Sequence, residues 1–277
     1  MSSKRTQKIA LSIAGSDSSG GAGIQADLKT FTAFDCFGMS SLTAVTAQNS
    51  QTLSDLHSIP PKSVAAQITT LLEDYTISAI KIGMVANPEN AEAIAITLKN
   101  APSIPIIVDT PLMASTGPAL TSGDVAGALR HHIFPIATLI TPNLDEAATL
   151  LGSSSKASSL DEMVAQSQSL HAAGAKAVLL KGGHLTEPAP TEAVDVFYNG
   201  TEAKIVKAPW VEIPHRHGTG CALSAAIAAS MAQGQDLLSA IQRAKTWLTS
   251  CLEASSAMQL GAAEGPVNIL KKPKFNG

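Results

Sequence analysis

Short, almost entirely apolar runs alternate with helix-like segments along nearly the whole chain. Ile9–Ala14, Ile104–Val108 and Ala137–Ile140 have the length of strands and lack a polar residue at every second position. Strands of this kind are buried on both faces, which is typical of parallel strands with helices packed on each side. The pattern therefore predicts an α/β protein with a mostly parallel sheet that helices cover on both faces.

The same pattern places the remaining elements. Further strands are expected at Met39–Ala47, Ile77–Ile82 and Ala177–Lys181, and helices at Ala22–Phe34, Pro61–Asp74, Pro88–Lys99, Leu160–Ala173, Gly218–Ala232 and Leu237–Ser250. Asn199-Gly200 is a strong turn signal and predicts a hairpin of Val194–Tyr198 with Lys204–Ala208. No linker-like break interrupts the series, so residues 1–277 are predicted to form one domain, with flexible ends at 1–8 and 271–277.

Composition narrows the function classes. Of 277 residues, 45% are hydrophobic and 15% charged, which is enough apolar material for a substantial core, and the formal net charge of −3 argues against nucleic acid as a partner. Three cysteines without metal-type spacing argue against a disulfide framework and a zinc site. No stretch approaches the length of a membrane span, and Ile9–Ala14 is too short for a signal-peptide core. The expected compartment is the cytoplasm, with no membrane partner.

Polar and glycine-rich residues gather where the predicted strands end. They are Gly15-Ser16-Asp17, Gln48-Asn49, Gly83-Met84, Asp109-Thr110, Asn143 and Lys181-Gly182-Gly183-His184. The carboxyl ends of parallel strands share one edge of the sheet, and ligands bind there. A binding site is therefore expected at this edge.

His217-Gly218-Thr219-Gly220-Cys221 leads directly into a predicted buried helix. Glycines allow close approach of the backbone to a ligand, and the amides of a helix N-terminus favour phosphate. The same field favours the thiolate of Cys221, which is then a candidate base. The alternative is a glycine-rich turn that caps a core helix, with Cys221 as a small buried hydrophobic residue.

Three further residues fit phosphoryl transfer, each with a structural alternative. Asp109 ends a buried strand, where a carboxylate commonly binds Mg²⁺ or its water shell in phosphoryl transfer. The alternative is that Asp109 only caps the segment that follows. Asn143 and Glu146 have capping-box spacing, which would also fix Glu146 at the sheet edge. Lys181 either meets nucleotide phosphates or lies at the surface.

The loop from Gly15 to Gly23 is expected to cover a substrate. Gly21-x-Gly23-x-x-Ala26 matches a dinucleotide-binding pattern on paper. However, Gly21 lies six residues beyond Gly15 at the strand end, and the acidic residue expected about twenty positions later is missing. A nicotinamide-dependent oxidoreductase is therefore rejected.

These motifs, taken in order, carry a family resemblance. They are Gly15 to Thr30 (GSDSSGGAGIQADLKT), Ala47-Gln48-Asn49, Lys81-Ile82-Gly83-Met84, Thr141-Pro142-Asn143-x-x-Glu146, Lys181-Gly182-Gly183-His184 and His217-Gly218-Thr219-Gly220-Cys221. The chain resembles the hydroxymethylpyrimidine/phosphomethylpyrimidine kinases of the thiamine pathway, in the ribokinase-like superfamily, over about residues 9–268. The resemblance implies a three-layer α/β/α sandwich, a homodimer, ATP and Mg²⁺. It also implies two successive phosphorylations, of 4-amino-5-hydroxymethyl-2-methylpyrimidine and of its monophosphate.

The resemblance also implies a role for each matching residue. Gln48 would bind the pyrimidine, and Gly15, Ala22, Asp27, Met84 and Pro111 would border or support its pocket. Asp109 and Glu146 would serve Mg²⁺, with Asn143, Lys181 and Lys245 on the nucleotide side. Gly218, Thr219 and Gly220 would form the anion hole, and Cys221 would be the base, because a primary alcohol is a weak nucleophile.

The chain departs from the family pattern at three places. It has Asp109-Thr110-Pro111-Leu112-Met113 where Asp-Pro-Val-Met is frequent, Ser115 where many members carry lysine, and His215-Arg216 where Asn-Thr is usual. We hypothesise that Arg216 partly replaces the missing lysine, since guanidinium binds phosphate well. The alternatives are a vitamin B6 kinase, which shares the cysteine, and a non-catalytic pyrimidine-binding protein.

Overall fold

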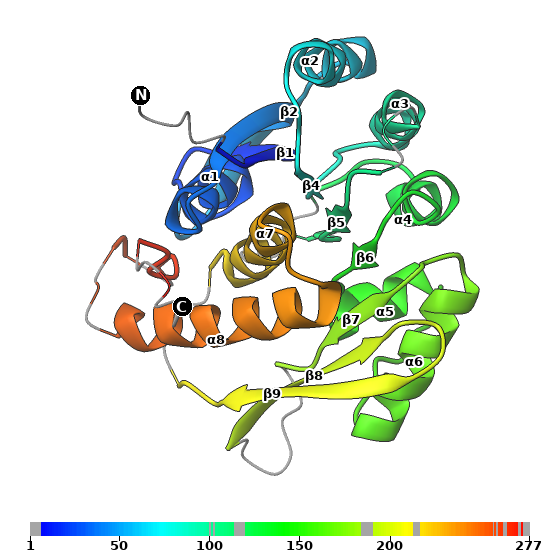
Figure 1. Cartoon of the computed structure of the whole chain (residues 1–277), viewed down its shortest axis with the longest axis vertical. Coiled ribbons are helices and arrows are strands. Elements are labelled where there is room, and N and C mark those ends of the chain that lie inside the picture. Colours follow the sequence, from blue (N-terminus) through cyan, green and yellow to red (C-terminus); the bar gives the residue numbers. More distant parts are fainter. Residues whose placement is uncertain are drawn as a thin grey trace, which may run out of the picture.

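A computed structural model describes residues 7–99, 101, 103–113, 120–183, 191–212, 217–256, 258, 260–262, 265–270 and 273. Nine strands within these ranges form one sheet in the order β3-β2-β1-β4-β5-β6-β7-β8-β9 (Figure 1). The strands are β1 (Ile9–Asp17), β2 (Phe37–Gln48), β3 (Leu53–Ser58), β4 (Ala79–Ile82), β5 (Ile106–Val108), β6 (Leu139–Ile140), β7 (Val178–Lys181), β8 (Glu192–Tyr198) and β9 (Ala203–Pro209).

The centre of the sheet is parallel and its two margins are antiparallel. Strands β2, β1, β4, β5, β6 and β7 pair in parallel, whereas β3 pairs antiparallel with β2, and β8 with both β7 and β9. The mostly parallel sheet is confirmed, as is the hairpin around Asn199-Gly200. Strand β3 was not predicted, because Leu53–Ser58 is mostly polar and lies exposed at the edge.

Helices cover both faces of the sheet. On one face lie α1 (Gly23–Ala33), α7 (Thr219–Ala232) and α8 (Leu237–Ser255). On the other lie α2 (Pro61–Asp74), α3 (Pro88–Leu98), α4 (Val125–Ala128), the π-helical turn η1 (Leu129–Ile133), α5 (Leu144–Leu150) and α6 (Leu160–Ala172). Figure 1 shows α1, α7 and α8 on one side of the strands and the others opposite. The three-layer prediction is confirmed.

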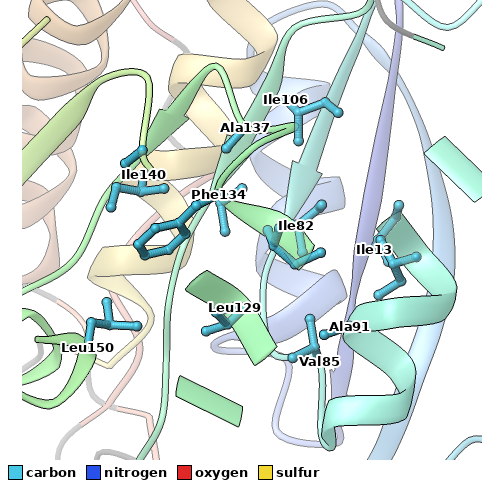
Figure 2. Packing of buried hydrophobic residues seen from close by; sticks show 14 of the residues in the cluster. Ile13, Ile82, Val85, Ala91, Ile106, Leu129, Phe134, Ala137, Ile140 and Leu150 are labelled. Atoms are coloured by element: carbon cyan, nitrogen blue, oxygen red, sulfur yellow. The ribbon is translucent and has the colours of Figure 1, made fainter. Parts of the chain in front are cut away.

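Each central strand supplies side chains to both cores. In β5, Ile106 and Val108 belong to the core beneath α2–α6, and Ile107 belongs to the core beneath α1, α7 and α8. Figure 2 shows the first core, where Phe134 and Ile82 pack among other fully buried apolar side chains. Because every second residue faces the opposite layer, strands buried on both sides lack polar alternation.

The packing brings one helix N-terminus to the carboxyl edge of the sheet. α7 packs against β1, β4 and β5, and its first turn lies beside the residues that follow these strands. A Cβ atom at Gly220 would lie 3.2 Å from Lys181 Nζ and 3.3 Å from Asp109 Oδ2. Residues far apart in the sequence therefore meet at this edge.

Candidate functional site

A cavity of about 1180 Å³ lies at the carboxyl edge of the sheet. Nearly all the predicted site residues line it: Gly15, Ala22, Gln48, Met84, Asp109, Pro111, Asn143, Glu146, Lys181, Gly218, Thr219, Gly220, Cys221 and Lys245. Asp27 is fully buried beneath the cavity and does not line it. Arg216 and Ser115 lie outside the described residues.

The glycine-rich loop and the start of α7 are in tight contact. Gly218 is the N-cap of α7, with φ 82° and ψ 5°. A Cβ atom at this position would lie 1.9 Å from the carbonyl oxygen of Gly21. Position 218 therefore requires glycine for two reasons: the backbone is left-handed, and it passes too close to Gly21 to leave room for a side chain. The N-terminus of α7 consequently opens into the cavity beside the loop.

Asp17 holds the glycine-rich loop in shape. Its carboxylate accepts hydrogen bonds from the Ser19 and Ala22 amides, both at 2.8 Å, and lies 3.1 Å from His217 Nε2. Burial raises the pKa of Asp17, but the bonds to His217, Ser19 and Ala22 outweigh it and lower the pKa to about 2. Asp17 thereby connects the end of β1 with the segment that leads into α7. The sequence analysis gave it no role.

Asp109, which follows β5, and Lys181, at the end of β7, form an ion pair across the end of the intervening strand β6. Lys181 Nζ donates to Asp109 Oδ1 at 2.9 Å, and Thr141 Oγ1 donates to the same oxygen at 3.1 Å. Burial raises the pKa of Asp109, but Lys181 and Lys81 lower it by a larger amount, so the carboxylate stays charged. Lys181 is thus partly neutralised where the sequence suggested a solitary phosphate ligand.

Glu146 belongs to a complete capping box. Its Oε2 accepts hydrogen bonds from the Asn143 amide at 2.9 Å and from Thr110 Oγ1 at 3.1 Å, and Asn143 Oδ1 accepts from the Glu146 amide at 2.8 Å. Burial, together with the charge of Asp109, raises the pKa of Glu146 to about 7, against the effect of Lys181. Capping and a place at the cavity are therefore compatible.

The expectation of a thiolate at Cys221 is wrong for the protein as described. Burial raises the pKa of the Cys221 thiol to about 11, and Asp27 and Asp109 act in the same direction. Lys81 and the Gly23 amide oppose these effects without overcoming them. The sequence argument considered only the helix N-terminus and left out the cost of removing a charge from water.

In the far half of the cavity, Lys245 was predicted from the sequence, but its partner Asp195 and the residues around them were not. Lys245 in α8 donates to Asp195 Oδ2 in β8 at 2.5 Å, and the Gly182 amide donates to Asp195 Oδ1 at 3.1 Å. Trp210, Val211, Glu212, Leu248, Thr249 and Leu252 line the same region. These residues follow an antiparallel hairpin or lie within a helix, so no motif or parallel strand end points to them.

Two structural searches bear on cofactors and partners. Within the described ranges, no group of three or more His, Cys, Asp or Glu side chains has the arrangement of a metal centre. In the same part of the chain, no helix is both long and apolar enough to cross a membrane.

Comparison with known proteins identifies the chain. The family model for phosphomethylpyrimidine kinase matches residues 17–268. Hydroxymethylpyrimidine/phosphomethylpyrimidine kinase from Rhizobium meliloti (strain 1021) is 42% identical over 260 residues, which cover 94% of this chain and 96% of that protein.

Two solved structures share the fold. Phosphomethylpyrimidine kinase from Clostridium difficile 630 superposes with a TM-score of 0.75 at 37% identity, covering 88% of this chain and 99% of that one. Pyridoxal kinase from Staphylococcus aureus, in complex with AMP-PCP and pyridoxal, superposes with a TM-score of 0.85 at 30% identity, covering 96% of this chain and 94% of that one.

The fold is that of the ribokinase-like vitamin kinases. Within that class, the chain belongs to the phosphomethylpyrimidine kinase family. The family predicted from the sequence motifs is therefore confirmed, and the chain is a phosphotransferase.

Adding one methyl group at Gly218 is expected to disable the site. In Gly218→Ala, the Cβ atom displaces Gly21 and the loop, and a shift of about 1 Å lowers turnover by about 100-fold. Gly234→Ala is the matched control, because Gly234 also has a positive φ (90°) but nothing within 4 Å of its Cβ position. It should lose about 1 kcal/mol of stability and retain full turnover. Equal turnover in the two variants would contradict the close-contact account.

Asp17→Asn is expected to destabilise the fold in a pH-dependent way. The pKa of Asp17 is lowered from 3.8 to about 2, so its charge stabilises the fold by about 2 kcal/mol above pH 3.8. This contribution is lost as the pH falls through the folded-state pKa of about 2. Denaturant titrations of both proteins at several pH values should show a gap that closes in acid. A gap of constant size would refute the role of the charge.

Proposed function

We propose that the chain transfers the γ-phosphate of ATP to the 5-hydroxymethyl group of 4-amino-5-hydroxymethyl-2-methylpyrimidine and then phosphorylates the monophosphate, in thiamine biosynthesis. The observation that carries this proposal is the cavity itself. It joins a helix N-terminus, a carboxylate pair and a cysteine beside a loop that carries the family motif. A purely pyrimidine-binding protein would not require this combination.

The pyrimidine is assigned to the half of the cavity beside the glycine-rich loop. Gln48 lines this half, and Ser18 Oγ bonds to both the amide and the carbonyl of its main chain, at 2.9 and 2.8 Å. An amide side chain offers the paired donor and acceptor that a pyrimidine edge requires. Gly15 leaves room there, because a Cβ atom at that position would lie 2.2 Å from Met84 Cε. Ala22 and Pro111 complete this half.

ATP is assigned to the opposite half, with its transferred phosphate at the first turn of α7. The amides of Gly218, Thr219 and Gly220 and the positive end of the helix suit an anion. Lys181 lies 2.9 Å from Asp109 and adds a cation next to this turn. Asn143 and Lys245 line the nucleotide half. Arg216, which lies outside the described residues, is proposed to bind phosphate in place of the missing lysine.

Asp109 and Glu146 fit a magnesium ion. The two carboxylates repel each other, and this repulsion contributes to the raised pKa of Glu146. A divalent cation bound between them would relieve the repulsion. Mg²⁺ commonly uses one or two carboxylates together with substrate phosphates, so a cluster of three acidic side chains is not required. Bound there, the ion would neutralise charge on the phosphates.

Cys221 is proposed as the general base. As the substrate oxygen bonds to phosphorus, its proton passes to the sulfur of the ionised thiolate, the bond from phosphorus to the bridging oxygen breaks, and ADP leaves. A base contributes about 10²–10⁴-fold to such a step. The raised pKa of the thiol means that only a small fraction is ionised near neutral pH. Turnover should therefore increase as the pH rises above 7.

Three further properties are proposed, two from the sequence pattern and the last from the resemblance. They are a single domain, a location in the cytoplasm and a homodimer. For the homodimer, β2 offers an exposed apolar side chain next to the edge strand β3, because Val45 is exposed and pairs with His57 of β3.

Pyridoxal is a second candidate substrate. The observation that favours it is the Staphylococcus aureus structure, which contains pyridoxal and AMP-PCP and has the same fold at a TM-score of 0.85. The first proposal is preferred because both the family model and the Rhizobium meliloti relative are phosphomethylpyrimidine kinases.

A coupled assay of ADP release distinguishes these activities. With limiting hydroxymethylpyrimidine, we expect two ADP released per pyrimidine, since the monophosphate is itself a substrate. One ADP per pyrimidine would eliminate the second step. Turnover of pyridoxal without turnover of hydroxymethylpyrimidine would contradict the proposal and show a vitamin B6 kinase instead.

Cys221→Ala tests the base. We expect kcat to fall by about 10²–10⁴-fold, because the proton acceptor is removed, while ATP affinity measured by calorimetry stays within about threefold of the parent. The rise of turnover above pH 7 should also disappear. The matched control is Cys36→Ala, since Cys36 is buried between α1 and α7, away from the cavity. Near-normal turnover in Cys221→Ala would rule out the base role.

A further inference from the structure

A fully buried ion pair lies beneath the cavity. Lys81 Nζ in β4 donates to Asp27 Oδ2 in α1 at 2.8 Å, and neither side chain has any exposed surface. Ser12 Oγ in β1 donates to the same Oδ2 at 2.6 Å. The pair is thus fixed between the sheet and the helix layer that contains α7.

Burial of this ion pair costs a large desolvation free energy, so its net contribution to fold stability is small. Asp27 Oδ1 is buried and has no hydrogen-bond partner among the described residues, and the bond to Asp27 uses one of the three N–H groups of Lys81. Gly83 makes room for the ammonium, because a Cβ atom at that position would lie 2.8 Å from Lys81 Nζ. Well-packed apolar side chains would stabilise such a site equally well or better.

Lys81 lies where it can influence the reacting groups. Its fully buried side chain lies directly beneath the cavity that Cys221 and Asp109 line, and α7 packs against β4. Among the charged groups, Lys81 has the largest effect on the pKa of Cys221 and lowers it, whereas Asp27 and Asp109 raise it. Lys81 is thus a buried cation close enough to Cys221 to stabilise its charged form.

We propose that Lys81, held in place by Asp27 and Ser12, is a positioning residue whose fixed ammonium stabilises negative charge on Cys221 and at the first turn of α7 during phosphoryl transfer. This inference rests on the proposed function, in which Cys221 takes the proton of the substrate hydroxyl. Lys81 itself neither gains nor loses a proton in the step. Its contribution is a charge that is already in place when the reaction begins.

Paired neutral variants separate this role from a structural one. Lys81→Met alone leaves Asp27 buried without a counter-charge and should lower Tm by on the order of 10 °C. Lys81→Met combined with Asp27→Leu removes both charges and should restore Tm to within a few degrees. Lys81→Gln with Asp27→Asn is a second neutral pair that retains polar side chains. Lys207→Met is the charge-matched control, because Lys207 is exposed and pairs with Glu192 on the surface.

In the folded neutral pairs we expect kcat to fall by about 100-fold, as on removal of one preorganised electrostatic group, with KM for ATP and pyrimidine within about threefold. Lys207→Met should match the parent. Recovery of both Tm and kcat in a neutral pair would overturn the proposal and leave the ion pair a purely structural element. A parent enzyme that turns over neither pyrimidine nor pyridoxal would instead overturn the proposed function.

Alkylation of Cys221 is a readout that does not depend on kinase activity. Iodoacetamide reacts with the thiolate, and Cys221 is partly exposed whereas Cys36 and Cys251 are buried. At pH 8, peptide mass spectrometry should show Cys221 labelled about tenfold more slowly in the neutral pairs than in the parent and in Lys207→Met. Equal labelling rates would contradict an effect of Lys81 on Cys221.

Discussion

The close contact between the N-cap of α7 and the glycine-rich loop underlies the rest of the site. Gly218 lies so near Gly21 that no side chain fits between them. This contact brings the positive end of a buried helix to the carboxyl edge of the sheet, next to Asp109 and Lys181. Asp17 secures the same junction through His217. An anion-binding helix end and a substrate loop thereby become one cavity.

Around this cavity, three lysine ammonium groups are each paired with an aspartate carboxylate. Lys81 pairs with Asp27 at 2.8 Å, Lys181 with Asp109 at 2.9 Å and Lys245 with Asp195 at 2.5 Å. Each pair joins different elements, so each ammonium is held before any ligand arrives. Preorganised charge of this kind is well suited to phosphoryl transfer, in which positioning and electrostatic stabilisation provide most of the catalysis.

Much of this arrangement could be predicted from the sequence because its signals are local. The apolar strands, the capping box at Asn143 and the glycine-rich turns depend on short spacings, and the structure contains all of them. The failures concern long-range effects. The pKa of Cys221 depends on burial, and the role of Asp195 depends on a partner in α8, 50 residues away. Strand β3 is polar and owes its conformation to pairing with β2.

The central claim is that pyrimidine and nucleotide meet at the first turn of α7. A crystal structure of the protein with AMP-PCP, Mg²⁺ and hydroxymethylpyrimidine tests this most directly. The account predicts the pyrimidine edge on Gln48, the γ-phosphate at the amides of Gly218 to Gly220, and the substrate hydroxyl between that phosphate and Cys221. A pyrimidine bound away from Gln48, or a γ-phosphate remote from α7, would contradict it.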